Sequence, residues 1–319
     1  MPEPIRLLTA DGARSSGLSF DQPVPRQLVH RAAIAEVFVT DAVVQGDDHY
    51  LVGAQWPRDH AFYHPTAGGG TDPVLFAETI RQAMVYLAHR HQGVPLGSRF
   101  TGRDIAWELT DTGPLLVRDE PTAALLDARW TWLDRRRRRL RVDVVLSVDG
   151  HVCGRGHISA AVLGERQYRI LRRRTDFAPA GPPVPPVRRE PAAHVGRLRA
   201  KDVVVGRDPA GDGWRLLLDQ SHPSLFDHPV DHVPLMGLME AVRQIGHFVA
   251  HAGPADDRAW SLTAFDATFT TFIELDQPTA LVVRSPHGNT GSPHRIPLTV
   301  DVEQARATVA TTRSVWSAA

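Results

Sequence analysis

The sequence has only one cysteine, Cys153, among its 319 residues. A single thiol cannot form an intrachain disulfide, and it rules out a zinc site built from cysteines. This usage fits a reducing compartment, so we expect a cytoplasmic protein. No run of about 18 apolar residues occurs, and the first residues lack the apolar core of a signal peptide. We therefore expect no membrane association.

Neither sign of charge is in excess, because 36 Lys and Arg residues balance 36 Asp and Glu residues. Proteins that bind nucleic acid usually carry a basic excess, so nucleic acid is not an expected partner. His60 and His64 are four residues apart, but Pro65 follows them and the segment reads as a loop. The helical spacing of two zinc ligands is then lost, and we expect no metal.

A short motif occurs twice in the chain. The pattern E-x-x-R-Q lies at residues 78–82 and again at residues 240–244, an offset of 162 (240 − 78). The same offset relates the Ala-His pairs at residues 88–89 and 250–251. Such self-similarity indicates one supersecondary unit used twice, and the length is sufficient for two domains.

The elements around the two motifs follow the same order. In the first block we expect a hairpin of strands 34–44 and 50–56, a helix over 74–91, and strands near 99–109, 123–133, 139–149 and 151–163. In the second block we expect strands near 195–206 and 213–219, a helix over 233–251, and strands near 259–275, 279–285, 294–303 and 305–316.

Between the blocks, residues 176–192 contain six prolines and predict an extended linker. The predicted domains are thus residues 22–175 and 193–319. A long helix wrapped by an antiparallel sheet is the plan of the hotdog fold. We predict an α+β protein, a tandem double hotdog in which the two halves form a pseudo-dimer.

The second helix carries a polar stripe beside its apolar one. Residues three and four apart share a helix face, so Glu240, Arg243, Gln244 and His247 can converge. A solvated ion pair is one interpretation of this stripe. Inside a wrapping sheet, however, few helix faces meet water, and buried charges are costly unless they are paired or used. We therefore interpret the stripe as a candidate site.

These segments resemble a known family. Residues 221–244 (SHPSLFDHPVDHVPLMGLMEAVRQ) are similar to the A-factor biosynthesis hotdog family, the AfsA-like γ-butyrolactone signal synthases of actinomycetes. VPRQLVHR at residues 24–31, FYHP at 62–65 and AETIRQA at 77–83 resemble the same family. The resemblance covers about residues 22–165 and 195–315. One departure is Leu235, which stands where the family pattern has glycine.

The resemblance implies an acyltransferase. Such proteins join a β-ketoacyl group, carried as a thioester on acyl carrier protein, to the hydroxyl of dihydroxyacetone phosphate, and they need no metal or redox cofactor. The product leads to a γ-butyrolactone, furan or butenolide signal. A glutamate could be the general base if burial raises its pKa, an arginine could hold the phosphate, and helix N-terminal amides could stabilise the oxyanion.

We accordingly predict two groups of residues. The expected catalytic residues are Glu240, Arg243 and Glu78. The expected substrate-binding residues are Arg81, Gln244, Gln82, His228, His64 and His247. The second copy is favoured for chemistry, because it has His247 where the first copy has Val85.

Two other functions remain open. One is a hotdog thioesterase or dehydratase acting on thioesters of acyl carrier protein or coenzyme A. The other is a non-catalytic module that binds an acyl signal. A thioesterase needs no phosphate-binding arginine, which favours the transferase. A monomer with an internal pseudo-dimer and a homodimer are both compatible with the sequence.

Overall fold

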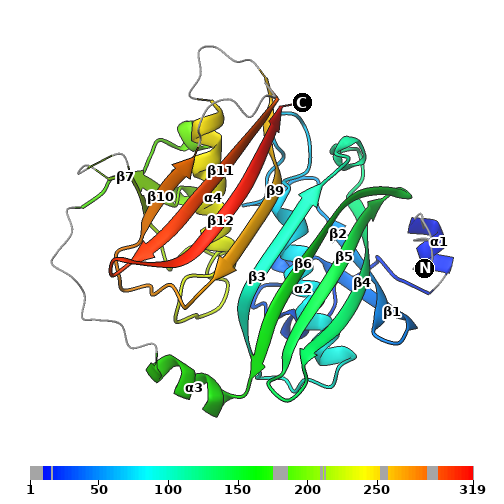
Figure 1. The fold of residues 1–319 in the computed structure, drawn as a ribbon. Helices are drawn as coiled ribbons and strands as arrows, with labels where there is room; N and C mark the ends of the chain where they lie inside the picture. The colour runs from blue at the N-terminus through cyan, green and yellow to red at the C-terminus, as the bar shows by residue number, and fades with distance from the viewer. Residues whose placement is uncertain are drawn as a thin grey trace. The chain divides into compact units, whose positions relative to one another are not determined.

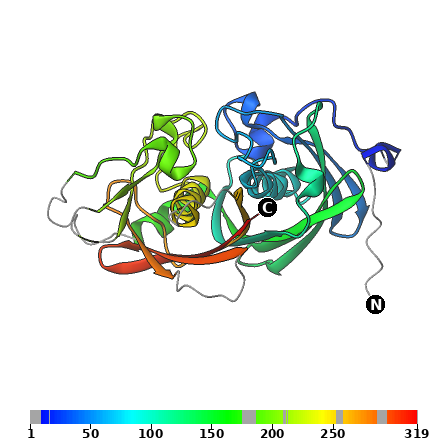
Figure 2. The ribbon, with the colours of Figure 1, turned by 90° about the horizontal axis from the view of Figure 1, so that it is seen from above.

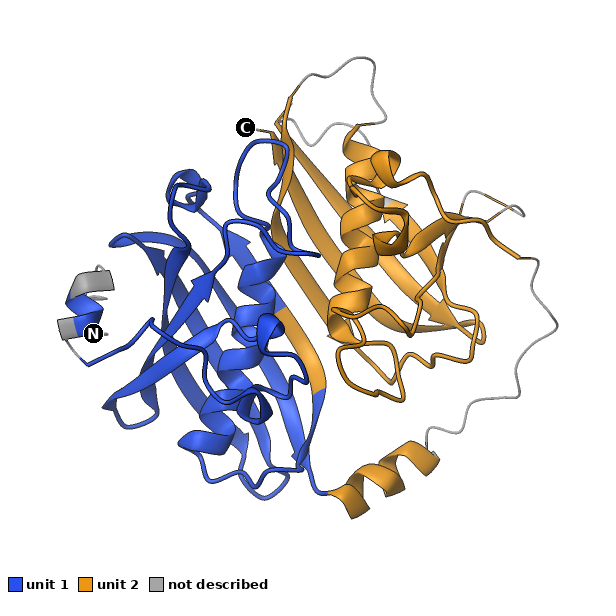
Figure 3. Cartoon of the chain, turned by 180° about the vertical axis from the view of Figure 1, so that it is seen from behind, with its two compact units in different colours: residues 1–101, 106–164 blue, residues 102–105, 165–319 orange. Residues whose placement is uncertain are grey.

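The computed structural model describes residues 10–15, 17–174, 186–208, 211, 213–251, 258–285 and 294–318. The chain divides into two compact units, residues 1–101 with 106–164 and residues 102–105 with 165–319 (Figure 3). Each unit contains one long helix and an antiparallel sheet, as predicted (Figure 1). Residues 176–185 of the expected linker lie outside the described residues, and the predicted domain bounds stay a prediction.

The first unit contains a helix, α2 (Val74–Arg90), and a sheet ordered β1-β2-β4-β5-β6-β3. Its strands are β1 (Val39–Gly46), β2 (His49–Trp56), β3 (Arg99–Leu109), β4 (Thr122–Asp134), β5 (Arg139–Val148) and β6 (His151–Leu163). Its short helices are α1 (Ala10–Ser15), η1 (Arg26–Val29), η2 (Ile34–Glu36) and η3 (Gly113–Leu115). Residues 34–36, expected in the first strand, form the 3₁₀ turn η2 instead.

The second unit contains α4 (Leu235–Ala250) and strands ordered β9-β12-β11-β10-β8-β7. Its strands are β7 (Val205–Arg207), β8 (Trp214–Leu216), β9 (Trp260–Phe269), β10 (Ala280–Ser285), β11 (Arg295–Gln304) and β12 (Ala307–Ala318). Its other helices are α3 (Glu165–Arg174), η4 (Ala192–Val195) and η5 (Ala200–Asp202). The sequence did not predict α3.

The strand expected over residues 195–206 is wrong for most of its length. Two 3₁₀ turns, η4 and η5, occupy this segment, and only residues 205–207 form a strand. Gly196 ends η4 with φ of 66°, a left-handed conformation that a strand does not contain and that glycine adopts at low cost. The turn matters because Arg197 follows it directly.

The long helices are buried on nearly every side. In α2 only Arg81, His89 and Arg90 are not buried. Phe76 of α2 packs against Trp107 of β3 with ring centroids 6.2 Å apart. Figure 2 shows α2 and α4 end-on, each in the curve of its own sheet. The polar face of α2 lies under η1 and η2, and that of α4 under η4 and η5. Among the helices that the structure describes, none is long and apolar enough to cross a membrane.

Close packing of α4 on its sheet depends on Gly246. A Cβ atom at this position would lie 2.0 Å from the indole nitrogen of Trp316, a side chain only 2% exposed. We expect Gly246→Ala to lower the free energy of unfolding by about 1–3 kcal/mol or more, because a buried indole has no room to move. Gly213→Ala is the matched control, since no atom lies within 4 Å of its Cβ position. Chemical denaturation of both variants measures the difference, and equal midpoints would contradict the prediction.

Candidate functional site

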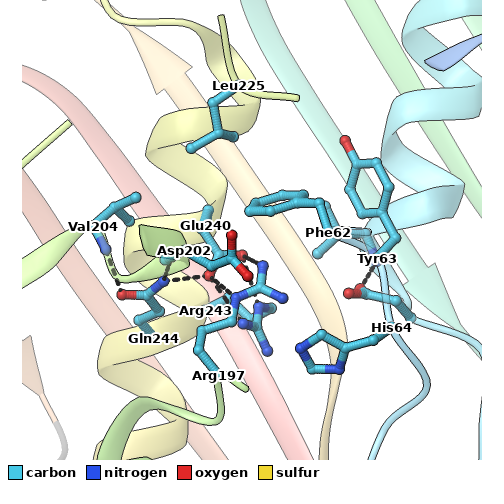
Figure 4. A network of polar contacts seen from close by, with 12 residues as sticks. Phe62, Tyr63, His64, Arg197, Asp202, Val204, Leu225, Glu240, Arg243 and Gln244 are labelled. Carbon is cyan, nitrogen blue, oxygen red and sulfur yellow. Dashed lines mark hydrogen bonds and ion pairs between the residues drawn. The ribbon is translucent and has the colours of Figure 1, made fainter. Parts of the chain in front are cut away.

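The second unit contains a buried cluster around the Glu240 carboxylate on α4. Arg243, one turn later, donates from Nε to Glu240 Oε2 and from Nη2 to Oε1, both at 2.9 Å. Arg197, which follows η4, donates from Nε to Oε1 at 2.7 Å and from Nη2 to Oε2 at 2.5 Å. Figure 4 shows the carboxylate facing both guanidinium groups. Two bidentate pairs thus converge on one fully buried carboxylate.

These contacts set the ionisation state of Glu240. Burial alone would raise its pKa, but the charges of Arg197 and Arg243 and their hydrogen bonds outweigh burial and lower the pKa to about 2. The condition set for a general base, a pKa raised by burial, is therefore not met with both arginines in place. The carboxylate is ionised at neutral pH, and both of its oxygens accept hydrogen bonds from the two arginines.

Gln244 joins the cluster to the preceding turn. Its Nε2 donates to Glu240 Oε1 at 2.5 Å and to the carbonyl oxygen of Asp202 at 2.7 Å. Its Oε1 accepts the backbone N–H of Val204 at 2.9 Å. Both the oxygen and the nitrogen of the Gln244 amide therefore form hydrogen bonds, and they hold η5 against the helix. Its contacts give Gln244 a positioning role in the described structure (Figure 4).

The first unit repeats this cluster. Arg31 lies 2.6 Å from Glu78 through Nη2, Arg81 donates to both Glu78 oxygens at 2.8 and 2.9 Å, and Gln82 donates to Oε1 at 2.6 Å. Burial of Glu78 opposes ionisation, but Arg31 and Arg81 lower its pKa to about 2. Gln82 also donates to the Glu36 carbonyl oxygen at 2.7 Å. The sequence repeat is thus a repeat of a four-residue ion cluster.

The two arginines of each cluster differ in exposure. The side chains of Arg197 and Arg31 are 0% and 5% exposed, whereas those of Arg243 and Arg81 are 11% and 17% exposed. Each cluster holds two guanidinium groups for one carboxylate, so its side chains carry a net positive charge. An anion would be attracted there, and the helix arginines are the more accessible contacts.

Sequence reasoning missed Arg31 and Arg197. Both stand on loops, and they are related by an offset of 166 (197 − 31) rather than the 162 of the helices. The signal was present in the repeated pattern V-x-R, which reads Val29-His30-Arg31 and Val195-Gly196-Arg197. A search at a single offset cannot align both the turns and the helices.

A second repeated pair lies beside each cluster. His222 Nε2 lies 3.0 Å from Asp202 Oδ1, and His60 Nε2 lies 3.5 Å from Glu36 Oε1. In both turns the other ring nitrogen accepts backbone N–H groups two and three residues ahead. The histidine repeat is therefore His60 and His222. From the sequence, His60 was interpreted only as a possible zinc ligand. The carboxylates paired with these histidines stand in the same turns that bind Gln82 and Gln244.

The predicted histidines have other surroundings. His64 Nδ1 lies 3.3 Å from the Pro65 carbonyl oxygen, and His228 Nδ1 lies 3.6 Å from the Asp227 carboxylate. His247 stacks on His251 with ring centroids 4.0 Å apart. Burial, the nearby His251 and Arg243 lower the pKa of His247 to about 3, so its ring is neutral at neutral pH. The substrate-binding roles of all three histidines stay predictions.

The helix N-termini differ between the units. In the first, the Asp72 side chain accepts the Val74 N–H at 2.9 Å, which places an acidic group at the start of α2. In the second, the N-cap residue is also a proline, Pro234, and no acidic side chain among the described residues accepts a hydrogen bond from the first turn of α4. Gly237, not residue 235, is the glycine of its first turn, and a Cβ there would lie 3.2 Å from Leu218 Cδ2. The amides of this first turn suit a developing negative charge.

One cavity of the first unit lies away from the ion clusters. A cavity of about 730 Å³ in the first unit is lined by Arg14, Phe20, Gln55, Pro114, Leu116, Arg118, Asp119, Glu120, Pro121, Thr122, Ala123, Val148 and Asp149. None of the clustered residues lines it. Within the described ranges, no group of three His, Cys, Asp or Glu residues could hold a metal ion.

Comparison with solved structures agrees with the architecture. An acyl-ACP thioesterase from Bacteroides thetaiotaomicron superposes with a TM-score of 0.51 and 11% sequence identity, covering 84% of this chain and 98% of that chain. At this identity the likeness concerns the fold alone. It supports the predicted tandem hotdog arrangement.

Sequence relatives are closer. A Streptomyces virginiae protein named 2-oxo-3-(phosphooxy)propyl 3-oxoalkanoate synthase is 36% identical over 80% of this chain and 85% of its own. A Streptomyces coelicolor protein of the same name is 34% identical over 87% of each chain. The model of the A-factor biosynthesis hotdog domain matches residues 13–164 and 182–319, which include both ion clusters. The chain therefore belongs to the A-factor biosynthesis hotdog family, as the resemblance implied.

Proposed function

We propose that this protein is an acyltransferase that makes a 2-oxo-3-(phosphooxy)propyl 3-oxoalkanoate, the ester of a β-keto acid with dihydroxyacetone phosphate, for biosynthesis of a γ-butyrolactone-type signal. The observation that carries the proposal is the likeness, over 80% or more of the chain, to relatives named as this synthase. The two buried clusters agree with it, because each holds guanidinium groups suited to a phosphorylated substrate.

The reaction exchanges a thioester for an ester. The hydroxyl oxygen of dihydroxyacetone phosphate forms a bond to the thioester carbonyl carbon, and a tetrahedral oxyanion results. The carbon–sulfur bond then breaks, and the carbonyl re-forms. The hydroxyl proton passes through a base to the departing thiolate. The enzyme must therefore bind phosphate, remove one proton, stabilise one oxyanion and return the proton to sulfur.

Arg243 is the proposed phosphate contact, with Arg81 as its counterpart in the first unit. Each is the more exposed arginine of its cluster. Arg81 Nη1 also makes no hydrogen bond to any residue that the structure describes, so it is available to a ligand. Phosphate and guanidinium match in charge and geometry, and such charge-assisted hydrogen bonds are the strong ones. Gln244 and Gln82 then fix the position of each carboxylate.

Phosphate binding also gives Glu240 a route to act as the base. With two arginine partners its pKa is about 2, too low for a good base at neutral pH. A phosphate that draws Arg243 away removes one of these partners, and the remaining burial then raises the pKa. The acceptor thereby activates the carboxylate that deprotonates it. Glu78 and Arg81 form the alternative pair if the first unit is the reactive one.

The first turn of α4 is the proposed oxyanion site. Within the part of the chain that the structure describes, no acidic side chain accepts a hydrogen bond from this turn, whereas Asp72 places an acidic group at the start of α2. This contrast favours the second unit for chemistry. Acyl carrier protein is the proposed acyl donor. His228 and His247 in this unit, and His64 in the other, are proposed to contact the substrate.

The assay combines purified protein, a β-ketoacyl thioester of acyl carrier protein and dihydroxyacetone phosphate, and follows the products by mass spectrometry. We expect the phosphorylated ester, formed only when the acceptor is present. Release of free β-keto acid at the same rate without acceptor would instead identify a thioesterase. Binding of a lactone without any turnover would identify a non-catalytic signal-binding module.

Replacing the more exposed arginine of each cluster tests which unit carries out the reaction. We expect Arg243→Ala to raise KM for dihydroxyacetone phosphate about 10- to 100-fold, because a hydrogen bond to a charged group contributes about 1.5–3 kcal/mol. Arg81→Ala is expected to have the smaller effect. Arg284→Ala, which removes two surface ion pairs of a half-exposed arginine in the second unit, is the matched control. Steady-state kinetics on folded variants decides, and the reverse order of effects would assign the chemistry to the first unit.

A further inference from the structure

The hydroxyl group of Tyr63 is one of several buried polar groups of the first unit without a hydrogen-bond partner among the described residues, and it is the one whose ring packs beside the His60–Glu36 pair next to the ion cluster. The residue is only 2% exposed, yet its hydroxyl makes no hydrogen bond within the described part of the chain. Buried polar groups in proteins are nearly always hydrogen-bonded, because an unmade bond is costly. A donor left unmatched in this way is explained if its partner is a ligand.

Tyr63 is placed against the ion cluster of its own unit. Its ring packs edge-on against Phe38 with centroids 5.7 Å apart, and beside His60 with centroids 5.3 Å apart. Phe38 donates its backbone N–H to Gln82, which donates in turn to Glu78. His60 pairs with Glu36. The tyrosine thus belongs to the shell of residues that surrounds Glu78.

The second unit lacks this group. The turns that carry His60 and His222 have the same hydrogen bonds, in which each ring accepts the N–H groups two and three residues ahead. By this correspondence the position of Tyr63 is taken by Leu225, which is buried. The hydroxyl is therefore not required by the turn or by the ion cluster. It is an addition specific to the first unit.

The chemistry around the hydroxyl selects the kind of ligand. Burial raises the pKa of Tyr63 well above its ordinary value, and the nearby Glu78 raises it further, so the group remains a hydrogen-bond donor. Arg31 lowers this pKa, and Glu36 and Asp72 raise it. The buried hydroxyl is an uncharged donor, and it carries no charge that would compensate an anion placed against it. A neutral acceptor, such as a carbonyl oxygen, fits this position.

We propose that the first unit is an acyl-binding site in which the Tyr63 hydroxyl donates a hydrogen bond to a carbonyl oxygen of the β-ketoacyl group. The inference rests on the proposed function for the identity of the acyl group. It assigns a role to the first unit that does not depend on which unit carries out the transfer. The first copy of the cluster then lies in a substrate-binding site.

The test uses the full chain and an inert donor, a β-ketoacyl pantetheine amide whose C–N bond is not transferred. Isothermal titration compares the wild type with Tyr63→Phe, which removes one oxygen atom. We expect the dissociation constant of one acyl site to be at least tenfold larger in the variant. The melting temperature should stay the same or rise, because the variant loses an unmatched buried polar group.

Tyr50→Phe is the matched control, because the Tyr50 hydroxyl accepts a hydrogen bond from Gln92 at 2.9 Å. It should lower the melting temperature and leave binding unchanged. Equal binding by wild type and Tyr63→Phe would overturn the inference, whatever the melting temperature. Failure of the synthase assay with a retained Tyr63→Phe binding defect would refute the proposed reaction but support the acyl site. The two ideas can thus fail separately.

Discussion

Glu240→Gln is expected to lower the free energy of unfolding by about 3–5 kcal/mol, the cost of removing one partner from a buried ion pair. The glutamine would leave two guanidinium groups in a buried position without their shared carboxylate. Glu78→Gln should have a similar effect, because Arg31 and Arg81 surround it in the same way. Equilibrium unfolding in urea measures both.

The surface offers the control for this comparison. Glu303 pairs with Arg284 at a position where these side chains are 30% and 51% exposed, so Glu303→Gln should change stability by less than about 1 kcal/mol. A Glu240→Gln variant that unfolds at the wild-type urea concentration would show that the carboxylate does not compensate the two arginines. Loss of synthase activity in Glu240→Gln can be assigned to chemistry only at temperatures where the variant is folded.

Acid should destabilise the protein in two overlapping pH windows that begin at different pH values. The folded-state pKa of Glu78 and of Glu240 is about 2, below the ordinary value of 4.5. A lowered carboxylate pKa contributes stability that is complete above pH 4.5 and is lost as the pH falls toward 2. The difference corresponds to roughly 3 kcal/mol for each carboxylate. We expect a steep fall of unfolding free energy in this window.

Protonation of His247 accounts for the window that begins at the higher pH. Its pKa falls from 6.5 to about 3 on folding, so the unfolded chain binds an extra proton between these values. Stability therefore begins to decline as the pH drops below 6.5, before the carboxylates titrate. His247→Gln should flatten the curve between pH 6.5 and 4.5 and preserve the fall below it. An unfolding free energy that stays constant from pH 7 to 3 in the wild type would contradict both assignments.

The long helices were predictable because local sequence and tertiary role agree there. Residues 74–91 contain no glycine or proline and carry the repeated motif, and the helix spans Val74–Arg90. The second helix was expected over residues 233–251 and spans Leu235–Ala250. Helical periodicity also placed Glu240, Arg243 and Gln244 on one face, where the structure brings them together.

The rest of each cluster could not be predicted, because its partners come from turns far away in the sequence. Arg31 and Arg197 lie 47 and 43 residues before their glutamates. Without these two arginines, burial is the main expected effect on the pKa of each glutamate, so the lowered value could not be foreseen from the sequence. The error over residues 195–206 has the same origin. Val203, Val204 and Val205 favour a strand locally, but the turns η4 and η5 deliver Arg197 and Asp202 to the helix.

The arginine-to-glutamate spacing is 47 residues in the first unit and 43 in the second, and this difference locates a change in length between the two copies. Four residues separate 47 from 43, and the same four separate the spans from Glu36 to His60 and from Asp202 to His222. The change therefore falls between Glu36 and His60, a segment that contains the first hairpin, whose strands have eight residues in the first unit and three in the second. After duplication, this stretch gained or lost length while both ends stayed anchored to the helix. It marks the segment where insertions are tolerated, in evolution and in the laboratory.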